Sequence, residues 1–366
     1  MSPVAIGLLV AAALAGAAAL VLAIADGTTA RSGTVTITIN EEKQLVVPAG
    51  ASLLATLKAE RIFMPSACGG RGWCGLCKAR VAGAAGEVLP AELARLSAEE
   101  VKAGFRLTCQ VKVERDLRMY VPQSLLRAHQ FAAKVAAMRD LTYDIKEVTL
   151  ELVDPPEIDF VAGQFVQFEV PEYELARQPV YRAYSIASDP ADRHTLALEI
   201  RLVPNGIATT YVHRFLKVGD AVTVNGPYGE FHLRDSDRPI VFIAGGSGMA
   251  AIRAMLFEMA RTNSPRRATY FFGAKSRRDL FLVEEMRDFE ARIPHFAFVP
   301  ALSSPDREDS WDGETGLITD VVGRAIPSGA DSEAYLCGSP GMINASVAVL
   351  KKNGVAEDRI FYDRFA

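Results

Sequence analysis

Four cysteines constrain this chain more than any other feature. Cys68, Cys74 and Cys77 form a C-x5-C-x2-C pattern in the run ACGGRGWCGLCKAR, and Cys109 follows 32 residues after Cys77. Four thiolates are what a [2Fe–2S] cluster requires, two for each iron. The glycines of the run suit a loop wrapped closely around a cluster, because glycine adopts left-handed backbone angles freely; they are Gly69, Gly70, Gly72 and Gly75. The pattern predicts a protein that moves single electrons.

Two other uses of these cysteines fit less well. Five cysteines in 366 residues do not make the dense disulfide framework of a small secreted domain. Structural zinc usually shows two C-x-x-C pairs, or one with a histidine pair, and here only Cys74 and Cys77 form such a pair. The five histidines stand elsewhere, at positions 129, 194, 213, 232 and 295.

The N-terminus contains an uncharged apolar run. Residues 3–25 read PVAIGLLVAAALAGAAALVLAIA, and these 23 residues could span the hydrocarbon core of a bilayer. A cleaved signal peptide is the alternative, because the run ends in an A-x-A pattern. No Lys or Arg precedes the run, and Arg31 follows it. We therefore expect a single-pass anchor in the inner (cytoplasmic) membrane, with the catalytic domains in the cytoplasm.

The remaining chain has room for two or three domains, and its charge is nearly balanced. It carries 40 basic and 44 acidic residues, a net charge of −4, which gives no indication of a nucleic-acid partner. The first domain, expected at residues 34–126, alternates as TVTITIN over Thr34–Asn40 and returns as a hairpin over Gln44–Val47. We predict helices over 51–61 and 91–103 and strands over 78–81 and 107–113. A small sheet crossed by one helix and holding a cluster is a β-grasp ferredoxin.

Two further domains are expected from changes in the pattern. Residues 127–236 contain short strands separated by turns, which predicts an antiparallel β-barrel. The predicted strands are 145–152, 164–169, 182–188, 195–202 and 221–225. Residues 237–366 alternate strands and helices, which predicts a doubly wound parallel α/β sheet. There we expect helices over 249–261, 280–289, 318–325 and 342–353, and strands over 240–244, 268–273, 295–300, 333–337 and 359–362.

Two short motifs in the barrel could bind a flavin nucleotide. In the run Arg182-Ala183-Tyr184-Ser185, the arginine can grip a diphosphate, the tyrosine ring can lie along an isoalloxazine, and the serine can reach its reactive edge. A strand of alternating polarity would also produce these four letters often. Gly206 and Thr209 open a predicted helix, whose N-terminus can bind phosphate. An ordinary turn and helix cap fits this second motif equally well.

The α/β region carries a dinucleotide fingerprint and a cysteine. After the strand Val241–Ala244 come Gly245, Gly246, Ser247 and Gly248, which satisfy G-x-G-x-x-A in a strand–turn–helix context. The basic stretch 275–278 after the next strand could recognise a 2′-phosphate or be a solvated loop. Cys337 precedes Gly338 at the end of a later strand. A buried structural cysteine is the default for this position, and beside a nicotinamide it would shape the hydride-transfer pocket.

Taken in order, these motifs resemble ferredoxin–NADP⁺ reductase-type flavoproteins with a fused N-terminal [2Fe–2S] domain. The anchor, the cysteine loop, RAYSIAS, GPYGEF (226–231) and the stretch 301–318 look like those of the F subunits of Na⁺-translocating NADH:quinone oxidoreductases. The resemblance covers essentially the whole chain. It implies cluster ligation by Cys68, Cys74, Cys77 and Cys109. It also implies FAD binding by Arg182, Tyr184, Ser185, Gly206 and Thr209.

The resemblance further implies where NADH is bound and oxidised. Gly245, Gly246, Ser247, Gly248 and Gly338 would lie along NADH, and the basic stretch 275–278 matches relatives that use NADH. Ser185, Cys337 and Phe365 would be the catalytic residues, with Phe365 placed like the aromatic that covers the flavin ring. Electrons would pass from NADH to FAD, to the cluster, and then to a membrane partner or complex that is linked indirectly to quinone.

Two other functions remain open. One is a reductase that feeds a membrane-bound oxygenase, hydroxylase or desaturase. The other is a non-catalytic, cluster-bearing scaffold, which the intact flavin and nucleotide motifs disfavour.

Overall fold

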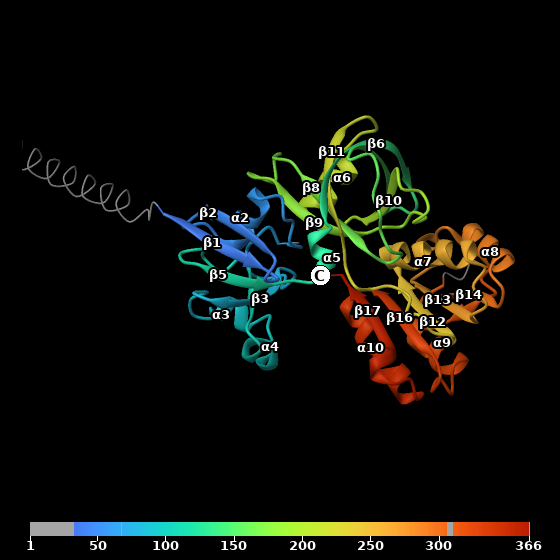
Figure 1. Cartoon of the computed structure of the whole chain (residues 1–366). Coiled ribbons are helices and arrows are strands. Elements are labelled where there is room, and N and C mark those ends of the chain that lie inside the picture. The colour runs from blue at the N-terminus through green and yellow to red at the C-terminus, as the bar shows by residue number, and fades with distance from the viewer. Residues whose placement is uncertain (1–32, 67, 306–309, 366) are drawn as a thin grey trace, which may run out of the picture. The chain divides into compact units, whose positions relative to one another are not determined.

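The computed structural model describes residues 33–66, 68–305 and 310–365, and the chain forms two compact units in it (Figure 1). Among the described residues, one unit consists of 33–60 and 70–122, and the other of the remainder. The anchor expected at residues 3–25 lies outside the described residues. Within the described part, no helix combines the length and apolar character needed to cross a bilayer.

The first unit is a mixed five-stranded sheet with a helix, as a β-grasp fold requires. Its strands are β1 (Thr34–Ile39), β2 (Lys43–Pro48), β3 (Lys78–Gly83), β4 (Phe105–Leu107) and β5 (Leu117–Tyr120), in the order β2-β1-β5-β3-β4. The pair β1–β5 is parallel and the other pairs are antiparallel. Helix α2 (Leu53–Ala59) begins at Ser52, whose hydroxyl accepts the Ala55 N–H at 3.2 Å. It is shorter than the helix expected over 51–61.

Two predictions in this unit were wrong. The helix expected over 91–103 is two helices, α3 (Pro90–Leu93) and α4 (Ala98–Lys102). The break occurs because Ser97 starts a new helix: its hydroxyl accepts the Glu100 N–H, and the Glu100 carboxylate accepts the Ser97 N–H at 2.7 Å. The strand expected over 107–113 ends at Leu107, where the Gln110 N–H donates to the Leu107 carbonyl and turns the chain. Cys109 therefore lies in a turn.

The second unit begins with a barrel. Helix α5 (Gln123–Leu126) precedes six antiparallel strands: β6 (His129–Asp140), β7 (Ile145–Asp154), β8 (Phe165–Val170), β9 (Val180–Ser185), β10 (Thr195–Arg201) and β11 (Ala221–Tyr228). Their order is β10-β7-β6-β11-β8-β9, and a bridge between Ile186 and Leu198 closes the sheet. Alternate residues such as Val135, Leu150 and Phe168 fill the interior. Helix α6 (Ile207–Arg214) begins at Gly206, and the strand expected to reach residue 188 ends at Ser185.

The barrel is followed by a parallel α/β sheet with the order β15-β14-β13-β12-β16-β17. The strands are β12 (Ile240–Gly245), β13 (Ala268–Ala274), β14 (Phe296–Leu302), β15 (Glu314–Thr315), β16 (Glu333–Gly338) and β17 (Ile360–Arg364). Helices α7 (Met249–Arg261) and α8 (Val283–Arg292) pack on one face, and α9 (Ile318–Ala325) and α10 (Pro340–Lys352) on the other (Figure 1). Short 3₁₀ turns cover 246–248, 277–279 and 357–359.

The helix expected over 280–289 begins three residues later. The Asp279 carboxylate accepts the Ser276 N–H at 2.8 Å and stabilises a 3₁₀ turn ahead of the helix. Strand β12 stands in the middle of the sheet, so the chain proceeds outward first through β13 and later through β16. This reversal makes the carboxyl ends of β12 and β16 a topological switch point, the position where open α/β sheets bind ligands.

Candidate active site

The glycine turn after β12 lies directly at the switch point. Ala244 pairs in register with Cys337, and Gly245 to Gly248 turn the chain from β12 into α7. A Cβ atom on Gly248 would lie 2.2 Å from the carbonyl oxygen of Cys337. Only glycine therefore allows the first turn of α7 to approach β16 this closely. The free amides of this turn suit a dinucleotide diphosphate.

Two residues predicted to be catalytic, Ser185 and Cys337, lie together although 152 residues separate them in the chain. Ser185 ends barrel strand β9 and Cys337 lies near the end of β16; their exposed fractions are 5% and 0%. Burial raises the pKa of the Cys337 thiol well above its usual value, and the Asp363 and Glu199 carboxylates raise it further. A hydrogen bond with Ser185 opposes this shift. Cys337 is thus a neutral thiol beside the serine hydroxyl.

The third member of this group is Asp363, which was not predicted from the sequence. It pairs in register with Cys337 across β16 and β17, and the Ser185 hydroxyl donates to its Oδ2 at 3.4 Å. Burial raises the pKa of the Asp363 carboxyl, and the hydrogen bond from Ser185 partly offsets the shift. The sequence did offer one signal for this residue. Asp363 is an acidic residue directly after the last predicted strand, 359–362, and two positions before Phe365.

Phe365, the third residue predicted to be catalytic, lies two positions after Asp363 in the sequence. Its N–H donates to the carbonyl of Gly338 at 3.0 Å, and its partly buried ring packs against the core beneath α7. The structure therefore places Phe365 beside the Cys337–Gly338 turn, within the same part of the sheet edge as the other predicted catalytic residues.

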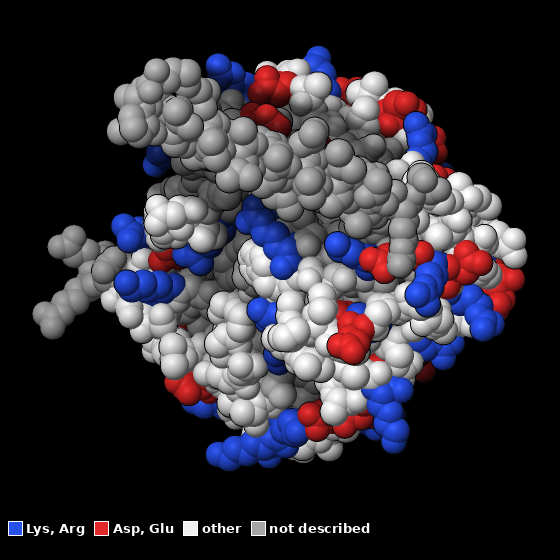
Figure 2. All heavy atoms as spheres, turned by 90° about the vertical axis from the view of Figure 1, so that its left-hand side faces the viewer, with Lys and Arg blue, Asp and Glu red and all other residues white. Residues whose placement is uncertain are grey.

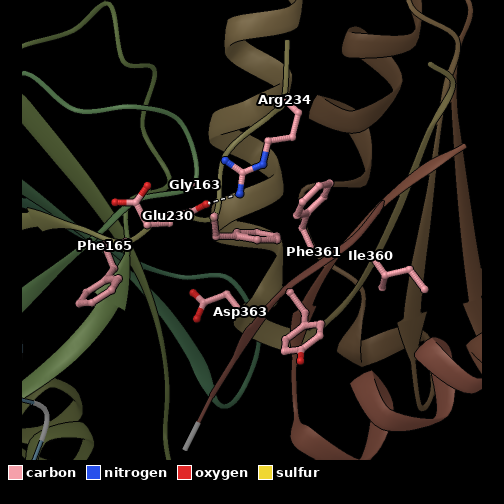
Figure 3. A pocket seen from close by; sticks show the side chains of 10 residues that line it. Gly163, Phe165, Glu230, Arg234, Ile360, Phe361 and Asp363 are labelled. Atoms are coloured by element: carbon pink, nitrogen blue, oxygen red, sulfur yellow. Dashed lines mark hydrogen bonds between the residues drawn. The ribbon is translucent and has the colours of Figure 1, made fainter. Parts of the chain in front are cut away.

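A cavity of about 370 Å³ opens beside Asp363 (Figure 3). Barrel residues Phe165 and Gly229 line one side, and Phe361 and Asp363 of β17 line the other. Phe165 is the register partner of Ser185, so the cavity adjoins the serine–aspartate pair. The Arg234 guanidinium lies over the Phe361 ring at 4.7 Å from its centroid. The cavity walls combine aromatic rings with the charged residues Glu230 and Arg234, and Asp363 of β17 adds a carboxylate.

The barrel residues predicted to bind FAD occupy β9 and the start of α6. Tyr184 is a partly exposed residue, while its hydroxyl is buried and has no hydrogen-bond partner in the part of the chain that the structure describes. The Thr209 hydroxyl accepts the Val203 N–H at 3.1 Å and holds the turn before α6. A Cβ on Gly206 would lie 2.5 Å from the Thr209 hydroxyl oxygen, so this tight turn also requires glycine. A partly exposed tyrosine with a buried hydroxyl, next to a helix N-terminus, fits a flavin nucleotide.

Two of the four predicted cluster cysteines lie in contact in the first unit. A hydrogen bond joins the thiols of Cys77 and Cys109, and it lowers the pKa of Cys109 to about 6 while raising that of Cys77. The Gly72 N–H and the Gln110 side-chain amide also point to the Cys109 sulfur, the latter at 3.4 Å. Gly72 has a φ of +82°. Amides directed at a buried sulfur are what a cluster thiolate needs.

The other two predicted cluster cysteines lie in separate segments of the chain. Cys74 lies half-buried in the loop before β3, and Cys68 is buried in the segment 61–69 that groups with the second unit. Over residues 33–66, 68–305 and 310–365, no three or more His, Cys, Asp or Glu side chains gather as a single metal ion would require.

A buried ion pair stabilises the cysteine region. Glu92 and Arg106 are 0% and 5% exposed, and the Arg106 Nη2 donates to Glu92 Oε2 at 2.8 Å. Glu92 also accepts the N–H groups of Leu89 and Leu107, while Arg106 donates to the carbonyls of residues 85, 86 and 87. The pair ties the loop 84–92 to β4, immediately before Cys109.

Comparison with known proteins agrees with this division of chemistry. Residues 37–114 match the 2Fe-2S iron-sulfur cluster binding domain, 132–233 the oxidoreductase FAD-binding domain, and 242–348 the oxidoreductase NAD-binding domain. The F subunit of the Na(+)-translocating NADH-quinone reductase of Neisseria gonorrhoeae is 36% identical over 95% of this chain and 96% of its own. The chain belongs to this family of F subunits.

Other relatives extend the match to almost the whole chain. The F subunit of the same reductase of Pseudomonas paraeruginosa is 37% identical over 99% of this chain and 98% of its own. Among solved structures, the Amycolatopsis cytochrome P450 reductase GcoB superposes with a TM-score of 0.75 and 29% identity, over 91% of this chain and 99% of its own. The ferredoxin reductase of carbazole 1,9a-dioxygenase gives 0.69 and 27%, over 91% and 98%.

Membership in the family of F subunits, with the three matched domains, establishes the cofactors. The chain is an NADH-dependent oxidoreductase whose domains bind FAD, NADH and a [2Fe–2S] cluster. Electrons pass from NADH to FAD and on to the cluster, as the sequence motifs predicted.

Proposed function

We propose that this chain is the NADH-oxidising input subunit of an NADH:quinone oxidoreductase complex in the inner membrane. The observation that carries the proposal is the match to F-subunit relatives over 95% of the chain, including all three cofactor domains. By this proposal the final acceptor is quinone, reached through other subunits. The domains are 34–126 for the cluster, 127–236 for FAD and 237–366 for NADH.

We assign the residue roles from the sequence motifs, and the positions of these residues in the fold support the assignment. Arg182, Tyr184, Ser185, Gly206 and Thr209 would hold FAD, and Gly245, Gly246, Ser247, Gly248 and Gly338 would lie along NADH. FAD supplies the ability to accept a hydride and to release its electrons one at a time. Cys68, Cys74, Cys77 and Cys109 would ligate the cluster.

The chain's own residues orient the reactants and hold protons. Ser185 donates to Asp363, so its hydroxyl is fixed at the end of β9 rather than free to rotate. Cys337, a neutral buried thiol, fills the floor of the nicotinamide position without adding charge. Phe365 would cover the flavin ring and move aside when the nicotinamide stacks there. Close stacking of the two rings is needed for hydride transfer.

We further propose that residues 3–25 form a single-pass membrane anchor with the catalytic units on the cytoplasmic side. Support comes from the 23-residue uncharged run and from Arg31 after it.

On the face shown in Figure 2, the described Lys and Arg side chains are interspersed with Asp and Glu. A mixed surface of this kind gives no support to a nucleic-acid partner.

A reductase that serves a membrane oxygenase is the second candidate function. It is favoured by the fold shared with GcoB, a cytochrome P450 reductase, and with the reductase of carbazole 1,9a-dioxygenase. The 29% and 27% identities to these proteins are lower than those to the F-subunit relatives.

Purification from native membranes distinguishes the two candidates. For this experiment an affinity tag is added at the N-terminus, because Asp363 and Phe365 of the candidate site lie near the other end of the chain. Co-purification with several membrane subunits and NADH:quinone activity is the expected result, and a preparation from cells that express the untagged chain is the control for non-specific recovery. Recovery of a histidine-rich diiron membrane protein instead would favour the oxygenase reductase.

A further inference from the structure

A buried cluster of charged side chains lies between the barrel and the nucleotide-binding helix of the second unit. Arg253, on α7, points its guanidinium at three carboxyl groups. Glu147 of β7 and Glu199 of β10 come from the barrel, and Glu285 comes from α8. The side chains of Arg253 and Glu147 are each 9% exposed, and that of Glu199 is 0% exposed.

The cluster contains one carboxyl group more than its arginines can neutralise. Glu285 receives a forked contact, with Arg253 Nη2 donating to its Oε2 at 2.9 Å. Glu147 is paired twice, with Arg253 Nη1 at 2.6 Å and with Arg139 Nε at 2.7 Å. Glu199 receives one contact of 3.4 Å from Arg253 Nη1, and its second oxygen is buried with no hydrogen-bond partner among the described residues.

Glu199 also faces like charge across its own sheet. It pairs in register with Glu147, and like charges at such paired positions repel each other. Within the described residues, Tyr270 of β13 and Cys337 of β16 also interact with it; both are fully buried and neither can neutralise a carboxylate. A fully buried carboxyl with one long contact and a facing glutamate is stabilised in its protonated form. Burial, reinforced by Glu147 and Glu285, raises the pKa of Glu199 to about 8 although Arg253 opposes the shift.

The position of the cluster gives it a role in the reaction. Arg253 lies one helical turn after the glycine turn at 245–248, so holding Arg253 also holds the start of α7. Next to it along the same two elements, Ala197 of β10 packs on Ala250 of α7. The contact between β10 and α7 therefore sets where the nucleotide-binding turn stands relative to the barrel.

We propose that Glu199, kept as a neutral carboxylic acid beside Arg253, is a positioning residue that fixes the NADH-binding turn against the flavin barrel. Ionised Glu199 would place a third carboxylate around Arg253 and push β10 away from α7. NADH would then be held less accurately for hydride transfer.

The test compares Glu199→Gln with Glu147→Gln, two substitutions of the same chemistry at register-paired positions. Gln at 199 reproduces the neutral acid, whereas Gln at 147 removes a carboxylate that is needed in its ionised form. Flavin reduction by NADH is followed by stopped flow from about pH 6 to pH 9. The wild-type rate should fall above pH 8, by up to about tenfold per pH unit for a single titrating group. The Glu199→Gln rate should not show this fall.

Thermal unfolding gives a second readout that does not depend on turnover. Because the folded-state pKa of Glu199 lies above its unfolded value, wild-type stability is lost as pH rises toward about 8. Glu199→Gln should therefore exceed the wild-type Tm by an amount that grows between about pH 5 and pH 8, reaching at least about 2–4 °C. Glu147→Gln should lower the Tm at neutral pH. If Glu199→Gln is destabilised as Glu147→Gln is, or keeps the wild-type pH profile, the proposal is wrong.

Discussion

Asp363 and Cys337 stand side by side in register on β17 and β16, and the same Asp363 carboxylate accepts the hydroxyl of Ser185 from the barrel. This hydrogen bond links the barrel to the α/β sheet of the second unit, at the point where the proposed residue roles would bring nicotinamide and flavin together. The carboxyl is partly buried, and this burial raises its pKa while the hydrogen bond from Ser185 opposes the shift. We expect Asp363 to orient Ser185 and to act as an acid–base group in the reaction.

Replacing Asp363 by Asn should slow flavin reduction by NADH roughly 10²-fold, within the range for loss of an acid–base group. The shape of the side chain is kept and the amide oxygen of Asn can still accept the Ser185 hydroxyl, but the group can no longer take up or release a proton. The raised pKa in the folded state means that ionised Asp363 costs stability as pH rises, so the Asn variant should be at least as stable at neutral pH. Single-turnover stopped flow measures the rate, and thermal unfolding excludes misfolding as the cause.

Asp358→Asn is the matched control, because this exposed residue lies five positions earlier in the same segment. It should leave the rate unchanged. A wild-type rate in the Asp363→Asn protein would remove Asp363 from the reaction.

Cys337 should resist alkylation in the native protein. Its side chain is fully buried and its thiol pKa lies well above the usual value, so almost no thiolate is present at neutral pH. Treatment with iodoacetamide followed by peptide mass spectrometry should show an unmodified Cys337 in folded protein and a modified one after denaturation. Rapid labelling of Cys337 in folded protein would contradict both the burial and the neutral state of the thiol.

Phe365 should affect the choice between NADH and NADPH, or the rate of hydride transfer. Its backbone is fixed to Gly338, so the Phe365→Ala substitution removes the ring while keeping the chain in place. Without the ring, the nicotinamide no longer competes with an aromatic group for its position, and discrimination between the two nucleotides should weaken. Stopped-flow reduction with each nucleotide measures this. Unchanged rates and unchanged preference would show that Phe365 does not cover the flavin.

The fold was largely predictable because its signals are local. The alternation in Thr34–Asn40 and the unbroken apolar run in Val241–Ala244 each determine a strand without reference to the rest of the chain. The glycine turn at 245–248 likewise indicates a strand–turn–helix unit. Errors occurred where a single local hydrogen-bonded feature decides the structure. The Ser97 cap divides the predicted helix 91–103, and a backbone turn after Leu107 removes Cys109 from its predicted strand.

The site was predictable only in part because its members meet through tertiary packing. Ser185 and Cys337 were found through motifs, but Asp363 has no motif of its own and acquires its role from the β16–β17 register. The role proposed for Glu199 was even less predictable from the sequence. In the sequence it is an ordinary charged residue of a strand, and only the packing of α7 on β10 reveals that Arg253 has three carboxyl partners.

The buried pair Glu92–Arg106 should determine the stability of the cluster-binding unit. Glu92→Gln leaves the Arg106 guanidinium buried without its counter-charge, and breaking a buried pair in this way costs about 3–5 kcal/mol. Although burial alone would raise the Glu92 pKa, the hydrogen bonds from Arg106, Leu89 and Leu107 lower it. The pair therefore stabilises the fold at neutral pH, and this contribution is lost as pH falls through the lowered folded-state value.

Urea unfolding at neutral pH, followed by the visible absorbance of the cluster, measures this cost. The midpoint should fall markedly in Glu92→Gln, while flavin reduction by NADH should be unchanged because the second unit is intact. Glu87→Gln is the control: this side chain is exposed in the same loop, and only its backbone carbonyl contacts Arg106. Equal midpoints for the two variants would show that the Glu92–Arg106 pair does not support the cysteine loop.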